Sequence, residues 1–347
     1  HASPASGSES TSVPSQSKMT PRSNAKQPSR ACQSAGMHAI VIEEKGGPEV
    51  LQLQDVPEPT AGDGELLVQV EAIGVNYRDV YEREGRGAAY GRAKLPLIVG
   101  AEGAGTVVGT GERVGWVAAP GSYAERVVVP ADAAIPIPDG VSSEQAAAVL
   151  LQGMTAHYLA YSTYAVQRDD IVVVHAAAGG VGLLLTQLCK ALGAYVVATT
   201  SGGEKAELAR AAGADEALGY GDFRARVEEL GGAHVVYDAV GATTFGDSLG
   251  ALRARGFMVL YGMSSGPAPA IDPQSLQAKS LYLTRPGLPQ YIATRDELLE
   301  RAGAVLGWVA DGTLDVRIGG RYPLAEARRA HEDLEARRST GKLLLIP

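Results

Sequence analysis

Cysteine is scarce in this sequence, and its histidines do not cluster. The chain of 347 residues contains two cysteines, Cys32 and Cys189, and six histidines scattered between His1 and His331. Two cysteines cannot form a disulfide framework or a cysteine-based zinc site, and no histidine cluster replaces them. We therefore expect a reducing compartment, with a cytoplasmic location as the default, and no catalytic metal.

Long apolar runs and an excess of basic charge are also lacking. The longest apolar stretch, residues 171–185, is broken by His175 and three glycines. It is shorter than the roughly 18 to 20 residues that a membrane-spanning helix needs. The 31 basic residues are outnumbered by 39 acidic ones, for a formal charge of −8. These features argue against a membrane location and against nucleic acid as a partner.

Residues 1–36 differ in composition from the rest of the chain. They contain ten serines, four basic residues and one acidic residue, without a helical or strand period. We expect this segment to be a disordered leader or tag, and an organelle transit peptide is the alternative. Residues 37–347, which then carry a formal charge of −11, form the folded part.

Two kinds of pattern follow one another in the folded part. From residue 37 to about 150, short alternating runs split by glycine and proline predict a mainly antiparallel β domain, with strands at 65–70, 105–108, 113–117 and 123–129. From about residue 155, helical stretches alternate with apolar strands typical of a doubly wound parallel sheet, at 171–175, 195–199, 234–237 and 257–261. The α/β prediction ends with helices at 295–309 and 325–338 and a strand at 343–346.

The strongest chemical signal follows the apolar run Val172–Val174. Ala177, Gly179 and Gly182 occupy the three positions of a G-x-G-x-x-G/A pattern between a predicted strand and a predicted helix. Such small residues let the backbone approach a pyrophosphate, and the helix start offers unpaired N–H groups. A purely structural turn is the alternative. We predict that a dinucleotide is bound by Ala178, Gly179, Gly180, Val181 and Gly182.

The end of the next predicted strand indicates which dinucleotide binds. NAD sites place an acidic residue there, whereas this chain has Thr200, Ser201 and two glycines, followed by Glu204 and Lys205. Ser201 leaves room for a 2′-phosphate, Lys205 supplies an opposing charge, and Tyr220 adds a phenolic hydroxyl. We predict NADPH as the cofactor. The alternatives are a solvated lysine and a half-buried tyrosine without a binding role.

Several motifs are spread over residues 37–347: G-V-N-Y-R-D-V-Y at 74–81, G-A-E-G-A-G at 100–105, G-M-T-A at 153–156, the turn at 175–182, Y-G-M-S-S-G at 261–266, L-T-R-P at 283–286 and T-G-K-L-L-L at 340–345. With them the chain resembles the zinc-free quinone oxidoreductase (zeta-crystallin-like) branch of the medium-chain dehydrogenase/reductase family. In the zinc enzymes the second motif reads G-H-E, so Ala101 stands where a metal ligand would be. One departure is the hairpin 107–113, which is shorter than usual.

The resemblance implies an architecture and a set of site residues. A GroES-like domain at 37–154, completed by 287–347, and a Rossmann domain at 155–286 would enclose a cleft, usually in a homodimer. By similarity, Asn76 and Tyr81 line the nicotinamide and substrate side of this cleft. The residues that the resemblance places at the carboxamide, the ribose and the adenosine phosphate are Thr155, Lys205, Tyr220, Val240, Gly241, Met263, Ser264, Ser265 and Arg337.

Together these expectations predict an NADPH-dependent quinone reductase that transfers a hydride without a metal. Quinone reduction asks little of protein acids, because the reduced oxygens can take protons from water. The catalytic candidates are Asn76, Tyr77 and Tyr81, which would form an amphipathic wall for a flat ring. For Tyr77, packing within its own domain is the alternative.

Two other functions stay open at this point. Residues 76–80 also resemble the N-F-R-D-V motif of polyketide-synthase enoyl reductases, so an enoyl-thioester reductase is the first alternative. That chemistry needs a positioned proton donor, for which Tyr81 and Tyr90 are the candidates. The second alternative is a non-catalytic, NADPH-binding structural or RNA-associated protein, which the charge of −11 disfavours.

Overall fold

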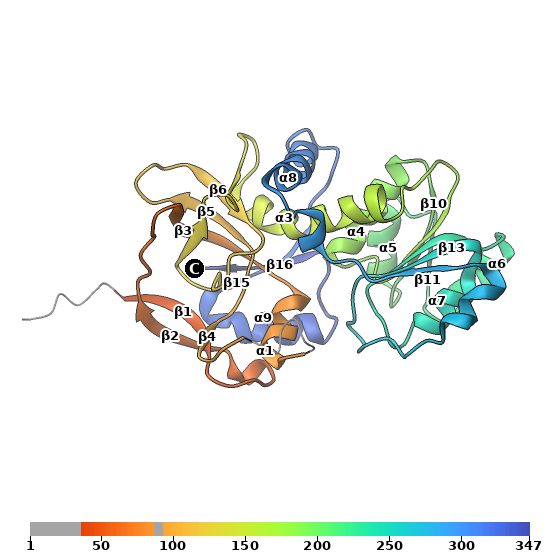
Figure 1. Cartoon of the computed structure of the whole chain (residues 1–347), viewed down its shortest axis with the longest axis horizontal. Helices are drawn as coiled ribbons and strands as arrows, with labels where there is room; N and C mark the ends of the chain where they lie inside the picture. Colours follow the sequence, from red (N-terminus) through yellow and green to blue (C-terminus); the bar gives the residue numbers. More distant parts are fainter. Residues whose placement is uncertain (1–35, 87–92) are drawn as a thin grey trace, which may run out of the picture. The chain divides into compact units, whose positions relative to one another are not determined.

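The computed structural model describes residues 36–86 and 93–347. Residues 1–35 of the leader predicted at 1–36 and Tyr90 lie outside the described residues, whereas Gly36 begins strand β1 and is not part of a disordered segment. Figure 1 shows a β-rich part, to which the end of the chain returns, and a part in which strands and helices alternate. The predicted domain boundaries stay predictions.

Short strands rich in valine and isoleucine build the β-rich part. One sheet has the order β2-β1-β4, and a larger one has the order β15-β16-β3-β5-β6-β8. β3 is central, because it pairs antiparallel with β5, β7 and β16. The strands are β1 Gly36–Ile42, β2 Gln52–Pro57, β3 Glu65–Val75, β4 Leu97–Ile98, β5 Gly103–Val107, β6 Arg113–Trp116, β7 Arg126–Pro130, β8 Ile135–Pro136, β15 Ile318–Pro323 and β16 Lys342–Ile346.

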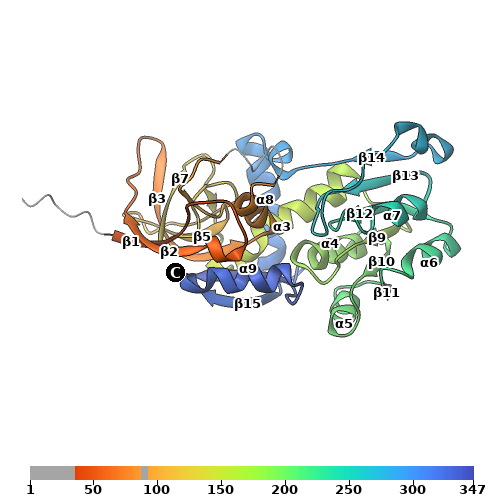
Figure 2. The same cartoon turned by 90° about the horizontal axis from the view of Figure 1, so that it is seen from below.

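A six-stranded parallel sheet forms the second part, in the order β11-β10-β9-β12-β13-β14. Its strands are buried on both faces: Val172 and Val174 lie in the core that contains α4, and Val173 lies in the core that contains α6 and α7. Figure 2 shows the order of these strands. This arrangement confirms the doubly wound α/β prediction. The strands are β9 Ile171–Val174, β10 Tyr195–Thr199, β11 Glu216–Leu218, β12 Ala233–Asp238, β13 Leu252–Leu260 and β14 Tyr282–Thr284.

The longest unpredicted element is helix α3, Ser143–Tyr158, which begins inside the stretch expected to be β-rich. Its start is a capping box, in which Ser142 accepts a hydrogen bond from the Gln145 backbone at 3.1 Å and donates its own N–H to the Gln145 side chain at 2.9 Å. The apolar residues of α3 are buried against both parts. Alanine has the highest helix propensity, and the capping box satisfies N–H groups at the helix start. Residues Ser143–Tyr158 therefore form a helix and not a strand.

The remaining helices agree with the sequence pattern more closely. The predicted helix 325–338 divides into a 3₁₀ turn, Leu324–Glu326, and α9, and it ends early, before Arg337 takes a left-handed φ of 56°. The α-helices are α1 Tyr77–Glu84, α4 Gly180–Ala191, α5 Glu204–Ala211, α6 Phe223–Glu229, α7 Phe245–Ala251, α8 Arg295–Ala310 and α9 Ala327–Glu335. Short 3₁₀ helices span Pro48–Val50, Pro273–Lys279 and Leu288–Tyr291, and a π-helix spans Leu159–Thr163.

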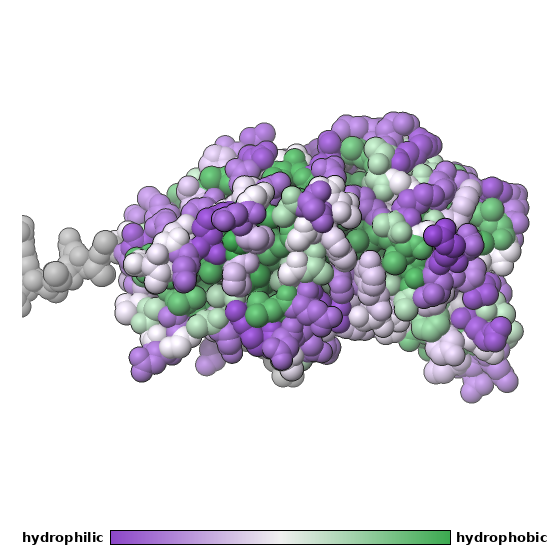
Figure 3. Space-filling view, turned by 90° about the horizontal axis from the view of Figure 1, so that it is seen from above, coloured by the Kyte–Doolittle hydropathy of each residue, from purple (hydrophilic) through white to green (hydrophobic). Residues whose placement is uncertain are grey.

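Hydrophilic side chains surround separate apolar patches on the face drawn in Figure 3. Among residues 36–86 and 93–347, none of the helices combines the length and the hydropathy that crossing a membrane requires.

A chain of buried polar side chains joins α1 to α9. Arg83 donates to Nδ1 of His331 at 3.1 Å, so this nitrogen is an acceptor and Nε2 of His331 carries the hydrogen toward the Tyr123 hydroxyl at 3.0 Å. Tyr123 in turn donates to Asp79 at 3.1 Å. Burial lowers the pKa of His331 to about 3 and raises the pKa of Asp79 to about 6. The network therefore holds a neutral histidine beside an arginine.

These groups make the free energy of unfolding depend on pH. His175, also buried, has its pKa lowered to about 4, so the folded protein leaves His175 and His331 neutral where the unfolded chain, with a pKa near 6.5, protonates both. Asp79 acts in the opposite direction, because its pKa is raised from 3.8 to about 6. Between pH 4 and 6 the unfolded state thus binds about one proton more, and we expect stability to fall by about 1.4 kcal/mol per pH unit on acidification. Urea unfolding across this interval measures the slope, and a slope of zero or of opposite sign contradicts the prediction.

Candidate active site

A tight turn joins β9 to α4. Ala176 has a left-handed φ of 52°, and its carbonyl accepts a hydrogen bond from the Gly179 backbone at 2.9 Å. The N-cap of α4 is Gly179, which has no side chain, and no other side chain in the described part of the chain caps the helix, so its first N–H groups are available to an anion. A Cβ added at Gly182 would lie 2.4 Å from the Ala176 oxygen and 2.7 Å from Cα of Ala177. Position 182 therefore requires glycine.

Gly182→Ala is expected to distort the turn, because the added Cβ would collide with backbone atoms, which cannot move aside as a flexible side chain can. We expect the Kd for NADPH to rise about tenfold or more. Fluorescence titration with NADPH measures this Kd. Gly303→Ala is the matched control, since a Cβ at Gly303 meets nothing within 4 Å. Unchanged binding by Gly182→Ala would show that the turn does not contact the cofactor.

Two cations lie together beyond β10. Lys205, at the start of α5, donates a hydrogen bond to the carbonyl of Arg337. Partial burial and the charge of Arg337 lower the pKa of Lys205. The nearby acids are paired elsewhere, because Glu204 contacts Arg317 at 3.3 Å and Asp333 contacts Arg338 at 2.7 Å. Two cations without a carboxylate partner among the described residues form a site suited to a phosphate.

Tyr220 and Ser201 are the other residues predicted for the adenosine phosphate end of the cofactor. Tyr220 stands 6.0 Å from the ring of His175, centroid to centroid, and burial raises the pKa of its hydroxyl. His175 is itself fully buried and bonded to Thr199 at 2.7 Å and Ser248 at 2.9 Å, as expected for a core histidine. Ser201 is exposed in the loop after β10.

A buried carboxylate shapes the loop after β12. Asp238 accepts hydrogen bonds from the backbone of Val240 at 2.7 Å and of Gly241 at 2.9 Å, and from the hydroxyls of Thr244 at 2.7 Å and Ser248 at 3.1 Å. The φ of Gly241 is 91°, a left-handed conformation that favours glycine. The Asp238 carboxylate thus fixes the backbone of the two residues predicted to enclose the ribose.

This loop is bonded to the loop after β13. The backbone N–H of Ser264 donates to Ala239 at 3.2 Å, that of Ser265 donates to Val240 at 2.9 Å, and the Ser265 hydroxyl also donates to Val240 at 2.8 Å. The N–H of Met263 donates to the hydroxyl of Tyr81 on α1 at 3.3 Å. Residues from two separate motifs, 74–81 and 261–266, therefore meet the predicted pair Val240 and Gly241 at one place.

The hydroxyls of two predicted site residues, Tyr77 and Thr155, form hydrogen bonds with groups outside these two loops. Tyr77 donates to the Leu334 carbonyl on α9 at 3.1 Å, although its ring lies 6.1 Å from that of Tyr81. Thr155 donates to the Leu151 carbonyl of its own helix at 2.7 Å. For Tyr77 this contact favours the alternative of packing within its own domain. The roles of both residues stay predictions.

Asn76 lies in a cluster that the sequence pattern did not predict. Its side-chain N–H groups donate to Glu102 at 2.8 Å and to the Gly74 carbonyl at 3.1 Å, and its oxygen accepts from Lys342 at 2.7 Å. Lys342 also contacts Glu102 at 2.5 Å, and all three side chains are buried. We call these residues the Asn76–Glu102–Lys342 cluster.

Comparison with known proteins decides the family. Residues 62–119 match the model of the alcohol dehydrogenase GroES-like domain, and residues 180–301 match that of zinc-binding dehydrogenases. A quinone oxidoreductase of Pseudomonas aeruginosa is 42% identical over 87% of this chain and 97% of its own length. The chain belongs to the quinone oxidoreductase branch of the medium-chain dehydrogenase/reductase family.

Solved structures of the family agree. A mycobacterial protein complexed with NADPH is 47% identical, with a TM-score of 0.86, and the match covers 90% of this chain and 100% of that one. The quinone oxidoreductase of Escherichia coli complexed with NADPH is 39% identical, with the same TM-score of 0.86, and the match covers 89% and 100%.

The second family model is described as that of zinc-binding dehydrogenases. Within residues 36–86 and 93–347, no group of three or more His, Cys, Asp or Glu side chains could hold a metal ion. Ala101 and Glu102 occupy the G-A-E turn, and the cation beside Glu102 is the ammonium of Lys342. Cys189 is buried, and burial raises the pKa of its thiol.

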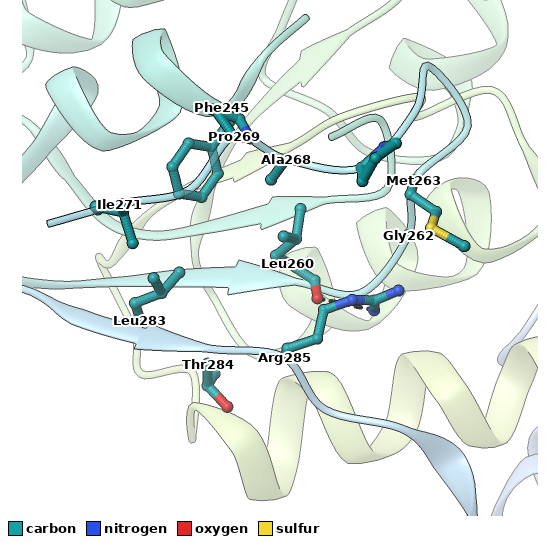
Figure 4. A pocket seen from close by; sticks show the side chains of 11 residues that line it. Phe245, Leu260, Gly262, Met263, Ala268, Pro269, Ile271, Leu283, Thr284 and Arg285 are labelled. Carbon is teal, nitrogen blue, oxygen red and sulfur yellow. Dashed lines mark hydrogen bonds between the residues drawn. The ribbon is translucent and has the colours of Figure 1, made fainter. Parts of the chain in front are cut away.

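A cavity of about 380 Å³ adjoins the loop after β13. Figure 4 shows its mainly apolar lining, from Phe245 at the start of α7 to Leu283 on β14. Arg285 lies at its edge and donates to the Leu260 carbonyl at 2.9 Å. Because Met263 borders both this cavity and Tyr81, the cavity adjoins the predicted nicotinamide side of the site.

Proposed function

We propose that this protein is an NADPH-dependent quinone reductase that transfers hydride without a metal. The strongest support is the Lys205–Arg337 pair beside the glycine turn, in a chain that is 42% identical to a quinone oxidoreductase over nearly its whole length. A phosphate between two cations that lack a carboxylate partner among the described residues relieves their repulsion.

The residues present fit the cofactor along its length. The turn at Ala178, Gly179, Gly180, Val181 and Gly182 offers N–H groups to a pyrophosphate, and Gly182 leaves room where a Cβ would collide with backbone. Lys205 and Arg337 would hold the 2′-phosphate, with Ser201 and Tyr220 beside it. The two hydrogen-bonded loops at 240–241 and 263–265 would hold the ribose and the nicotinamide. When bound, NADPH supplies the hydride.

On the acceptor side of the cleft, the protein has to orient the quinone and to exclude water. Burial raises the pKa of Tyr81 to about 12, so its hydroxyl stays protonated at neutral pH and can serve a quinone oxygen as a hydrogen-bond donor. The contact of Tyr81 with Met263 joins α1 to the cofactor loops and fixes the position of the ring. Asn76 and Thr155 complete the predicted lining of the cleft, whereas the hydroxyl of Tyr77 is bonded to the Leu334 carbonyl.

Substrate choice tests this function against the enoyl-thioester alternative. NADPH oxidation with 1,4-benzoquinone, 9,10-phenanthrenequinone and a crotonyl thioester is compared in one assay. We expect quinone turnover to exceed thioester turnover. Faster thioester turnover would reverse the assignment, and NADPH binding without turnover of either substrate would favour a non-catalytic role.

We also propose that the protein is a cytoplasmic homodimer that pairs through β14. β14 is the edge strand of the parallel sheet, so among the residues that the structure describes no strand pairs with one side of it. Its residue Tyr282 is 53% exposed, and exposed apolar surface of this kind is typical of an interface. The apolar cavity beside Leu283 adds to this surface. Light scattering coupled to gel filtration tests the proposal, and a monomer at micromolar concentration would contradict it.

A further inference from the structure

The Asn76–Glu102–Lys342 cluster joins three distant segments of the chain. Asn76 precedes α1, Glu102 precedes β5, and Lys342 begins β16. Lys342 is 266 residues from Asn76 and 240 from Glu102 in sequence. The side chain of Lys342 is 1% exposed and that of Glu102 is 0% exposed. Such a buried pair persists only where its hydrogen bonds are complete.

The donors and acceptors in the cluster leave one arrangement. An ammonium only donates and a carboxylate only accepts, so the Asn76 oxygen faces Lys342 and the Asn76 nitrogen faces Glu102. The other oxygen of Glu102 accepts from the Leu151 backbone on α3 at 2.7 Å. Both N–H bonds of Asn76 are used within the protein, the second by the Gly74 carbonyl. Asn76 therefore presents only its carbonyl oxygen to a ligand.

The residue before Lys342 contacts the cofactor turn. The N–H of Gly341 donates to the Ala178 carbonyl at 2.9 Å, and Gly341 pairs with Gly179 in a parallel bridge. Gly341 has a left-handed φ of 60°, and a Cβ there would lie 2.3 Å from the Arg317 carbonyl. A few residues earlier, the Arg337 carbonyl accepts from Lys205. One short segment, residues 337–342, thus contacts the phosphate site, the glycine turn and Asn76 in sequence.

We propose that Lys342 is a positioning residue for the reduction, which rests on the proposed function. Its ammonium fixes the Asn76 amide in one orientation, while the backbone of Gly341 fixes the same segment to the glycine turn. The segment thereby sets the distance between the cofactor turn and the Asn76 side of the cleft. Lys342 also supplies the positive charge next to Glu102 in the G-A-E turn.

Hydrogen exchange tests the positioning without turnover. In Lys342→Met, Glu102 loses its cation and Asn76 loses its donor, so we expect the Leu151 amide to exchange about tenfold faster in the cofactor-free protein. Lys190→Met is the matched control, because Lys190 forms an exposed pair with Asp215 at 2.6 Å, far in sequence from the cluster. Where Lys342→Met alone fails to fold, Lys342→Met/Glu102→Gln is compared with Glu102→Gln, so that the two proteins differ only at residue 342. Unchanged exchange at Leu151 in a folded variant overturns the proposal.

Kinetics separate positioning from a structural role. We expect Lys342→Met to lower kcat for quinone reduction about 100-fold, the effect of a displacement of about 1 Å, with the Kd for NADPH within about threefold of the wild type. In Lys342→Ala, added propylammonium should restore part of kcat, whereas 1-propanol should not. A kcat within about threefold of the wild type, or an equal loss of NADPH affinity, overturns the proposal.

The two readouts distinguish this proposal from the function on which it rests. If the wild-type protein binds NADPH but reduces no quinone, the proposed function fails, and the exchange rate at Leu151 decides the positioning alone. Faster exchange in Lys342→Met supports it in that case, and unchanged exchange contradicts it.

Discussion

Glu102→Gln is expected to lower the free energy of unfolding by about 3–5 kcal/mol, because it leaves the buried ammonium of Lys342 without a counter-charge. The new amide also turns N–H groups toward either the Leu151 backbone or the Asn76 and Lys342 donors. Urea unfolding at neutral pH measures the change.

Two further variants serve as controls for Glu102→Gln. Glu332→Gln breaks an exposed pair with Arg328, which is 59% exposed, and we expect it to cost less than about 1 kcal/mol. Lys342→Met added to Glu102→Gln removes the stranded charge and should recover part of the loss. A loss below about 1 kcal/mol for Glu102→Gln alone would mean that the cluster is not buried as described.

Loss of either cation at the phosphate site is expected to abolish much of the preference for NADPH. On the proposed binding of the 2′-phosphate, Lys205→Ala and Arg337→Ala would each remove a charge-assisted hydrogen bond worth about 1.5–3 kcal/mol, so the Kd for NADPH should rise about 10- to 100-fold. The Kd for NADH, which lacks the 2′-phosphate, should change less than about threefold. Fluorescence titration with both nucleotides measures the ratio.

Arg338→Ala is the matched control for this pair of variants. Arg338 neighbours Arg337 in sequence but is paired with Asp333 at 2.7 Å. We expect it to leave both affinities unchanged. If the affinity for NADH falls as much as that for NADPH, Lys205 and Arg337 contact some other part of the nucleotide.

Features encoded by neighbouring residues could be predicted from the sequence. The glycine turn was predictable because Gly179 and Gly182 lie between an apolar strand and an apolar helix, and local spacing alone carries that signal. The doubly wound sheet was predictable for the same reason, since strands buried on both faces read as continuous apolar runs. The family motifs added Tyr81 and Met263, whose contact the structure shows.

Contacts between distant segments could not be predicted in this way. The role of Glu102 depends on Lys342, 240 residues away, and that of Asp79 depends on His331 through Tyr123. One signal was present: Gly74 interrupts an apolar strand, and a Cβ there would lie 2.3 Å from Glu102. A glycine within a strand indicates close approach of another group, but not which group. Asp238 gave no comparable signal.

The central claim is tested most directly by following NADPH oxidation with 1,4-benzoquinone after exhaustive dialysis against a metal chelator. We predict that turnover is undiminished by the chelator and that NADH supports it far less well at equal concentration. Absence of quinone-dependent oxidation, or activity that disappears with the chelator and returns with added zinc, would contradict hydride transfer from NADPH to a quinone without a metal.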